Sequence, residues 1–536
     1  MPADLLIINA NGITMDPRNS STEAVAVTGG IITAVGTSDK LKSLAGPDTR
    51  ILDAAGKTLL PGFIDAHCHL LSLAGKQLLH VDCSAGKVDS IDGVIGELKK
   101  RAEATPPGQW VLGGRYDDTK LAENRHPTRQ DLDKASTKHP IHLRHVSGHM
   151  GVVNSRALEL GKFDRNTPDP EGGAFDRDAR GELTGMCREE ADFLFLPGIG
   201  FGEGLIPPPT AEQDVEAVRL ACQEYNSLGI TSVGDALVGP GEIAAYQSAL
   251  EQGLLSVRVY MLVLDNHLPA LKALQVRTGF GSDFLKIGGV KSFVDGAIAG
   301  RTAWLSEPYE GRPDDFGIPT KTPAETEEIV LAAHRAGYQL AVHANGDAAI
   351  NMVLDAYEKA LKLYPREDHR HRIAHCTVVT PEILARIKHL GVVVLPFSTY
   401  IYEHGEKMGE YGSRISMMFA HRSFLDYGIP VGGSSDNPCA TEDPLIAIQS
   451  MVTRRSSSGQ VLGPEQKISV EEALRIYTMG SAYAAFEEQR KGSIETGKLA
   501  DFVLLSDDPR RVDPERIMEI QVEETIVGGK SVYTRA

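Results

Sequence analysis

Cysteine, aromatic residues and long apolar runs are all scarce in this chain. Of its 536 residues, six are cysteine and 6% are aromatic, with only two tryptophans. The cysteines show no paired spacing, and a chain of this length needs no disulfides to hold its core, so we expect reduced thiols in a reducing compartment. They are Cys68, Cys83, Cys187, Cys222, Cys376 and Cys439.

Membrane and targeting signals are missing as well. No segment approaches the roughly 18–20 consecutive apolar residues of a membrane span, and the opening MPADLLIINANGITMD lacks the pattern of a signal peptide. Lys and Arg number 55 against 72 Asp and Glu, a net charge of −17 that argues against nucleic acid and anionic membranes as partners. We therefore expect a cytoplasmic protein that acts on a small molecule, with a homodimer as the candidate assembly.

Both ends of the chain carry β-like patterns. Residues 1–60 alternate short apolar runs with glycine-bearing turns, and residues 492–536 do the same in GSIETGKLADFVLLSD and ETIVGGKSVYT. Because chain termini often lie close together, we expect the two ends to form one small composite β-domain. The length and the 42% of hydrophobic residues leave ample chain for a second, larger domain over residues 61–491.

Within residues 61–491, eight short apolar runs alternate with longer segments of helical periodicity. Strands that alternate with helices pair in parallel, and eight such units predict a closed (β/α)₈ barrel. An open doubly wound sheet is the alternative, which the absence of a glycine-rich phosphate loop after the first run disfavours. The runs are residues 62–67, 229–236, 256–263, 284–293, 338–344, 371–376, 391–398 and 429–436.

The connection between the first and second runs is far longer than one crossover. Its residues 80–190 are rich in Gly, Pro, Asp and Arg and contain short β-like stretches such as WVLGG and PIHLRH. We interpret residues 80–190 as a subdomain inserted over the end of the first strand, where it would cover an active site.

Polar side chains stand where the predicted strands end. In a barrel, the C-terminal ends of the strands converge on one site. Four histidines, a lysine and an aspartate there predict a binuclear divalent-metal site with nitrogen and oxygen ligands. The six residues are His67, His69, Lys291, His343, His375 and Asp436. In HCH, strand alternation puts the two histidines on one face and Cys68 on the other.

Each of these residues has a simpler explanation on its own. A lone histidine at a strand end is usually a polar cap, and Asp436 in GSSDNP is a typical turn former. An ammonium group cannot bind a metal, so Lys291 qualifies only as a carbamate formed with CO₂. Six coincidences at strand ends are nevertheless less probable than one shared site.

These residues and several longer motifs resemble the amidohydrolase superfamily, most closely its family-3 branch, which includes N-substituted formamide deformylase-like enzymes. The matching stretches cover nearly the whole chain: PGFIDAHCH, SGHMGVVNSRAL, LTGMCREEA, GVKSFVDGAIAGRTA, VHANGDAAI, RIAHC, GSSDNPCATEDPL and GSIETGKLADFVLL. The resemblance implies a β-sandwich built from both termini, a (β/α)₈ TIM barrel, a metal site and hydrolysis. It also implies that Lys291 is carboxylated.

The expected activity is that of a metal-dependent amidohydrolase. One or two divalent ions, with Zn²⁺ favoured by the nitrogen ligands and Mn²⁺, Fe²⁺ and Co²⁺ open, would hold a hydroxide that attacks the carbonyl of an amide, N-substituted formamide or cyclic amide. Asp436 would move the proton from the water to the leaving amine. His67 and His69 would hold one ion, and His343 and His375 the other.

Two other functions stay open. Hydrolysis of an ester, lactone or carbamate needs the same site, and a non-catalytic scaffold is disfavoured because all six positions are filled. Candidate substrate-binding residues are Arg301, His149, Asn154 and Tyr400. Glu189 and Glu190 follow a TGM turn and could approach the metals, although helix capping or surface solvation is favoured for them.

Overall fold

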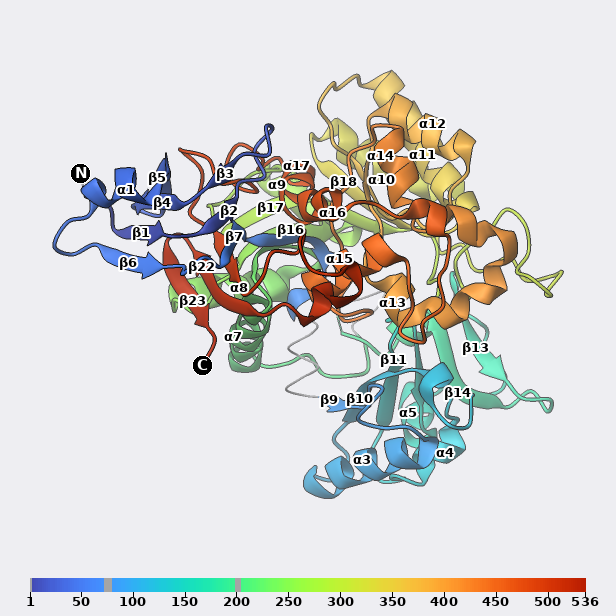
Figure 1. Ribbon diagram of the computed structural model, residues 1–536. Coiled ribbons are helices and arrows are strands. Elements are labelled where there is room, and N and C mark those ends of the chain that lie inside the picture. The colour runs from blue at the N-terminus through green and yellow to red at the C-terminus, as the bar shows by residue number, and fades with distance from the viewer. Residues whose placement is uncertain (1, 72–79, 198–203) are drawn as a thin grey trace.

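A parallel barrel forms the centre of the computed structural model, which describes residues 2–71, 80–197 and 204–536 (Figure 1). Seven strands lie side by side in the order of the chain, and each pairs in parallel with its neighbours. They are β8 (Phe63–Cys68), β15 (Ile230–Val238), β16 (Arg258–Leu264), β17 (Leu285–Phe293), β18 (Gln339–Ala344), β19 (Arg372–His375) and β20 (Val393–Leu395).

The eighth predicted run closes the barrel without forming a regular strand. Residues 430–436 lie between the first and last strands: the Val394 N–H donates to the Pro430 carbonyl at 3.0 Å, and the Ala66 N–H donates to the Gly433 carbonyl at 2.8 Å. The segment also packs closely against the helical layer, because a side chain at Gly433 would collide with the ring of Tyr477. The predicted TIM barrel is thereby confirmed.

Helices cover the outside of the barrel, and the main hydrophobic core lies between the two layers. In β18, Leu340 and Val342 pack toward the helices, whereas Ala341 belongs to a small cluster inside the barrel. The covering helices are α7 (Ala211–Ser227), α8 (Pro240–Glu251), α9 (Leu268–Leu274), α10 (Pro323–Arg335), α11 (Asp347–Leu363), α12 (Pro381–Leu390), α14 (His421–Asp426), α15 (Pro444–Thr453), α16 (Val470–Arg475) and α17 (Ser481–Ala484). A short helix, α13 (Tyr400–His404), follows β20.

Both termini build the predicted β-sandwich. One sheet has the order β5-β4-β1-β6 and the other β23-β22-β21-β7-β2-β3, so strands from the two ends of the chain share a sheet. Their bounds are β1 (Leu5–Ile8), β2 (Asn11–Ile13), β3 (Ser21–Thr22), β4 (Ala24–Thr28), β5 (Ile31–Gly36), β6 (Arg50–Asp53), β7 (Thr58–Pro61), β21 (Phe502–Leu505), β22 (Val522–Val527) and β23 (Lys530–Thr534), with α1 (Ser38–Leu41) beside them. Residues 1–60 with 492–536, and residues 61–491, remain our proposed domain limits.

The long connection after β8 forms a subdomain of its own. Its six-stranded sheet has the order β13-β14-β12-β11-β10-β9 and a separate hydrophobic core (Figure 1). The strands are β9 (His80–Asp82), β10 (Val111–Tyr116), β11 (Ile141–His145), β12 (Met150–Val153), β13 (Gly173–Arg177) and β14 (Leu183–Glu189); the helices are α3 (Ile91–Ala104), α4 (Arg129–Asp133), α5 (Ser155–Gly161) and α6 (Glu190–Phe193). The turn after β11 touches the barrel, where the Cys439 thiol donates to the Ser147 carbonyl.

The structure also shows how the chain uses its apolar helices and its cysteines. In the part of the chain that the structure describes, no helix has both the length and the apolar character needed to cross a bilayer. All six cysteines are buried, and none forms a disulfide within these described ranges.

Candidate metal centre

Six side chains meet at the C-terminal end of the barrel, and we call this group the barrel centre. It consists of His67 in β8, His69 directly after it, Lys291 in β17, His343 in β18, His375 at the end of β19 and Asp436 after the closing segment. The imidazole rings form a continuous row: centroid separations along His69–His67–His375–His343 are 5.6, 5.0 and 4.5 Å. All six side chains are buried. The structure thus brings together every residue predicted as a ligand.

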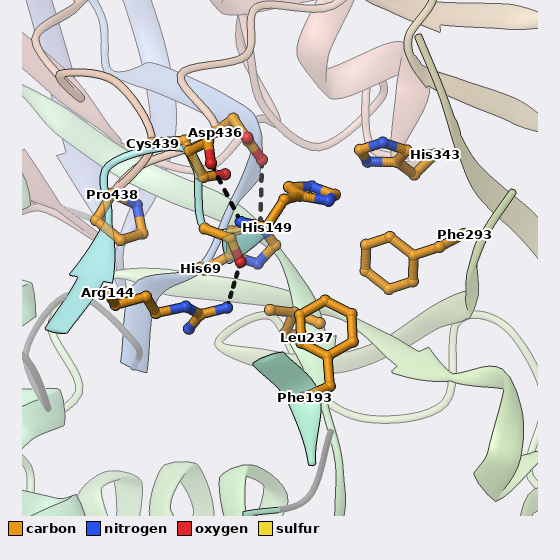
Figure 2. Close-up of a pocket in the computed structure, with 12 residues that line it drawn as sticks. His69, Arg144, His149, Phe193, Leu237, Phe293, His343, Asp436, Pro438 and Cys439 are labelled. Carbon is orange, nitrogen blue, oxygen red and sulfur yellow. Dashed lines mark hydrogen bonds and ion pairs between the residues drawn. The ribbon is translucent and has the colours of Figure 1, made fainter. Parts of the chain in front are cut away.

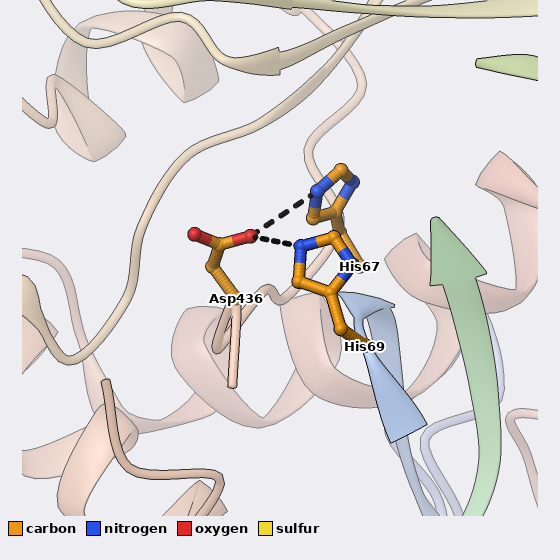
Figure 3. A group of neighbouring side chains, drawn as sticks. All are labelled: His67, His69 and Asp436. Atoms are coloured by element: carbon orange, nitrogen blue, oxygen red, sulfur yellow. Dashed lines mark hydrogen bonds and ion pairs between the residues drawn. The ribbon is translucent and has the colours of Figure 1, made fainter. Parts of the chain in front are cut away.

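Asp436 links the two histidines of the HCH motif. Its Oδ1 lies 3.1 Å from Nε2 of His69 and 3.3 Å from Nε2 of His67 (Figure 3). These three ligand atoms lie within 4.8 Å of one another. Lys291 adds a fourth group, because its Nζ lies 3.4 Å from the same nitrogen of His67 and 4.5 Å from the centre of the Phe293 ring.

Burial controls the protonation of this group. It lowers the pKa of His67 to about 3 and holds the pKa values of His343 and His375 well below the usual range. Burial alone would raise the pKa of Asp436, but the neighbouring rings of His375, His67 and His69, the last two through hydrogen bonds, hold it well below its usual value. Neutral imidazoles and an ionised carboxylate facing one point fit a divalent transition metal.

Two residues of the barrel centre adopt backbone conformations that side chains disfavour. The φ angle is 73° at His375 and 56° at Asp436. Such conformations cost about 1–3 kcal/mol each and persist where the surroundings impose them, typically at functional sites. Here the Asp436 N–H donates to the His67 carbonyl at 2.9 Å, which ties the end of the closing segment to β8.

Two carboxylates that the sequence did not reveal hold the barrel centre in place. Asp295 accepts backbone hydrogen bonds from Trp304, Asn345 and Gly346, and its Oδ1 lies 3.6 Å from Nε2 of His343. Burial raises the pKa of Asp295 to about 7 against these hydrogen bonds. In the sequence, Asp295 is one more acidic residue in a loop after β17, and nothing marks its contacts.

Asp65 is the second of these carboxylates, and it holds the β8 side of the barrel centre in place. It accepts hydrogen bonds from the N–H groups of His67 and Ser435, so it joins β8 to the closing segment. Burial raises its pKa to about 7. A readable signal exists here: a carboxylate two residues before His67 in an apolar strand shares the face of that histidine.

A pocket opens beside the barrel centre, and the inserted subdomain supplies part of its wall (Figure 2). His149 lies there with its ring 5.0 Å from that of His343. Its Nδ1 is 2.7 Å from Oε2 of Glu189. The pocket is lined by His69, Arg144, Ser147, Gly148, His149, Phe193, Leu237, Phe293, His343, Asp436, Pro438 and Cys439.

The position of Glu189 differs from the one expected from the sequence. Capping or surface solvation, the favoured interpretation, is wrong: the residue is 1% exposed and makes no capping hydrogen bond. It stands at φ 49° and ψ −125°, and its Oε1 has no hydrogen-bond partner among the described residues. A buried carboxylate on a strained backbone is typical of a functional site.

The other substrate-binding candidates lie apart from the pocket lining. Arg301 forms an ion pair with Glu410 at 2.6 Å. The side chain of Asn154 is used within the inserted subdomain, where it caps α5 by accepting from the Ala157 N–H and also bonds three backbone groups of residues 136–141. Tyr400 accepts a hydrogen bond from the Ala299 N–H at 3.1 Å.

Tyr400 reaches the barrel centre only through another ring. Its ring centroid lies 4.4 Å from that of Phe397, which stacks on His375 at 4.1 Å and an interplanar angle of 13°. Tyr400 therefore supports the position of a histidine rather than contacting the pocket.

A second histidine–carboxylate group lies in the inserted subdomain, and we call it the insert group: Asp118, His126 and His145. Nε2 of His145 lies 3.1 Å from Oδ1 of Asp118, and Nε2 of His126 lies 3.8 Å from Oδ2. Nδ1 of each histidine is hydrogen-bonded, that of His126 to Tyr116 and that of His145 to Ser147.

A lysine sits against the insert group. Nζ of Lys407 lies 2.9 Å from Asp117 and 3.7 Å from Asp118. An ammonium already faces these carboxylates, so a divalent cation placed among them would meet electrostatic repulsion. The barrel centre is the better metal site of the two.

Comparisons with known proteins agree with one another. The sequence pattern of the amidohydrolase family matches residues 50–533. An N-substituted formamide deformylase of Arthrobacter pascens is 34% identical over 99% of this chain and 98% of its own length. The putative amidohydrolase YtcJ of Bacillus subtilis is 32% identical over 98% of each chain. The structure of an uncharacterized metal-dependent hydrolase from Pyrococcus horikoshii matches with a TM-score of 0.75 and 26% identity, over 95% of this chain and 99% of the other.

Proposed function

This chain belongs to the amidohydrolase family and is a hydrolase, and from that membership we propose that it cleaves a C–N bond in a small amide, N-substituted formamide or cyclic amide. The observation that carries the proposal is the carboxylate of Asp436, whose Oδ1 lies within 3.3 Å of ring nitrogens of both His67 and His69. The relative named as a formamide deformylase favours a formamide within this class.

We propose that the barrel centre holds one or two divalent ions, with zinc as the first choice. His67, His69 and Asp436 supply one set of ligands, and His343 with His375 supplies the other. A divalent cation bound there would lower the pKa of a coordinated water and polarise a carbonyl oxygen. Neutral imidazoles are the form that binds a metal, and burial lowers the pKa of His67, His343 and His375 so that they are neutral.

Lys291 can complete the ligand set after reaction with CO₂. Burial lowers the pKa of its ammonium group to about 7, so near neutral pH a large fraction is the free amine. The amine nitrogen adds to the carbon of CO₂ and loses one proton, which leaves a carbamate with two oxygen ligands. The position of Nζ, 3.4 Å from Nε2 of His67, supports this role.

Asp436 is the proposed catalytic acid and base. It is ionised, and it lines the pocket in which a substrate carbonyl would lie. The carboxylate accepts a proton as the oxygen of water bonds to the carbonyl carbon. It then donates that proton to the nitrogen as the C–N bond breaks, and the products are a carboxylic acid and an amine.

His149 is the proposed hydrogen-bond donor to the substrate oxygen. Burial would lower its pKa, but the charge of Glu189 and the hydrogen bond to it raise the value above the usual one. With Nδ1 held by Glu189, a protonated ring presents Nε2–H to the pocket. A fixed donor of this kind stabilises negative charge that develops on a carbonyl oxygen.

The test uses a matched pair of substrates, N-benzylformamide and benzyl formate, which differ in the leaving atom. We expect the zinc-loaded enzyme to release formate from the formamide, to lose activity with a chelator and to regain it with Zn²⁺ and bicarbonate. A larger acceleration of the ester, relative to its uncatalysed rate, would assign ester hydrolysis instead. Zinc binding without turnover of either compound would indicate a non-catalytic relative.

A further inference from the structure

A second, larger cavity adjoins the pocket at the barrel centre. Its volume is about 380 Å³, against about 40 Å³ for the pocket. His149, Phe193 and Phe293 line both spaces, so the two share one wall. The pocket is therefore much the smaller of the two spaces. It suits a formyl-sized acyl group, and the rest of a substrate must extend toward the larger cavity.

Carboxylates dominate the lining of this larger cavity, which we call the acidic cavity. Seven Asp and Glu residues line it, and Lys321 is its one lysine or arginine. Lys321 lies 3.5 Å from Asp265 and is thereby engaged. Glu190 is half-buried and Glu328 exposed, and within the described ranges neither has an ion-pair partner within 4.0 Å. Excess negative charge in a partly closed space concentrates cations.

Glu189 provides a second, independent observation, a buried carboxylate oxygen without a hydrogen-bond donor among the described residues. It lines the acidic cavity, is 1% exposed, and its Oε1 has no hydrogen-bond partner among the described residues. Gly296 lies against this oxygen, because a Cβ on it would lie 2.3 Å from Oε1. Buried carboxylate oxygens are normally satisfied, so this one calls for an N–H donor from a ligand.

The pKa of Glu190 also responds to the neighbouring charges. Burial raises the pKa of Glu190 to about 6; Lys321 opposes the shift, and Glu189 and Asp265 add to it. The remaining walls are apolar and include Phe193, Phe293 and Leu264. A methylene chain would pack on such walls while its charged end reaches the carboxylates.

We propose that the acidic cavity binds a cationic group, a primary ammonium or a guanidinium, at the end of the amine half of the substrate. The inference rests on the proposed function for the position of the scissile bond. The substrate class is therefore an amine with a cationic far end and a small N-acyl group, of which an N-formyl diamine is the simplest example. Water adds to the acyl carbon, the C–N bond breaks, and the leaving nitrogen takes the proton, which releases formate and a diamine.

The experiment compares N-(5-aminopentyl)formamide with N-hexylformamide, in which a methyl group replaces the ammonium. For the zinc-loaded enzyme we expect kcat/KM to be roughly 10- to 100-fold higher for the cationic compound, the range of a charged hydrogen bond. The Glu190→Gln and Glu328→Gln variants should reduce this ratio. Glu382→Gln, the same change at an exposed position in α12, should keep the wild-type ratio.

A binding measurement separates this inference from the proposed function. Calorimetry on zinc-loaded Asp436→Asn gives the Kd of each compound without turnover. Tighter binding of the cationic compound, lost in Asp436→Asn combined with Glu190→Gln, supports the acidic cavity even if no formamide is hydrolysed. Equal Kd values, or an unchanged ratio in both glutamine variants, would overturn the inference while leaving amide hydrolysis intact.

Discussion

The barrel centre and the insert group contain the same residue types in different surroundings. Each has histidines whose Nε2 atoms approach an aspartate within 3.8 Å. In the insert group, hydroxyl groups hold both Nδ1 atoms, and Lys407 lies 3.7 Å from the carboxylate of Asp118. In the barrel centre, Nδ1 of His67 and His69 has no hydrogen-bond partner among the described residues. The same residue types can therefore form a metal site or a structural group, depending on the hydrogen bonds and ion pairs that their side chains make.

The two groups also differ in how the chain supports them. The barrel centre draws on strand ends that a closed sheet fixes in space, with Asp65 and Asp295 pinning the loops behind it. The insert group combines His145, at the end of β11 in the smaller sheet, with Asp118 and His126 from the connection that follows β10. We infer that the barrel centre serves chemistry and that the insert group stabilises the subdomain which covers it.

Metal content should separate the two groups most sharply. We expect His67→Ala to lose bound zinc and hydrolytic activity, because it removes a nitrogen that meets both Asp436 and Lys291. His126→Ala, the matched change in the insert group, should keep the zinc content of the wild type. Metal analysis by mass spectrometry after gel filtration measures both. Equal zinc loss in the two variants would show that the insert group also binds metal.

Turnover should distinguish the two aspartates. Asp436→Asn removes the proposed acid and base, and we expect kcat to fall by about 10²–10⁴-fold while bound zinc is largely kept. Asp118→Asn changes the equivalent residue of the insert group and should alter kcat little. Steady-state kinetics with the best formamide provides the comparison. A kcat near the wild-type value in zinc-loaded Asp436→Asn would remove this residue from the mechanism.

The free energy of unfolding should depend on the region of the insert group, in contrast to metal content and turnover. Lys407 is buried and pairs with Asp117, so Lys407→Met leaves a buried carboxylate without its cation. Breaking such a pair costs about 3–5 kcal/mol of the free energy of unfolding. Lys359→Met, which removes an exposed partner of Glu327, should cost less than about 1 kcal/mol. Urea denaturation measures both, and equal effects would deny a structural role to the Lys407–Asp117 pair beside the insert group.

The strand pattern was enough to predict which residues reach the barrel centre. Alternation placed His67 and His69 on one face, and the end of the eighth run placed Asp436 beside them. These positions depend on periodicity and on one topological rule, both of which a sequence displays. The barrel itself, the composite sandwich and the inserted subdomain followed in the same way.

Side-chain partners outside that rule were not predictable. Glu189 and His149 meet across two strands of the inserted sheet, whose order no periodicity encodes. His126, from the connection after β10, meets His145 at the end of β11, and no periodicity encodes that contact either. Asn154 is different, because its role has a signal in the sequence: an asparagine directly before a helical pattern is a typical N-cap, and the structure uses it as one.

The smallest effect concerns pH and Asp118. Burial would raise the pKa of this carboxyl, but the hydrogen bond from His145 and the charges of His126 and Lys407 hold it below the ordinary value of 3.8. A carboxyl with a lowered folded-state pKa stabilises the fold above its unfolded pKa, and that contribution disappears as the pH falls below it. The stability advantage of the wild type over Asp118→Asn should therefore be constant from pH 7 to 5 and shrink below about pH 4. Urea midpoints across this range test it, and an advantage that grew as the pH fell would show that Asp118 is not held ionised by these partners.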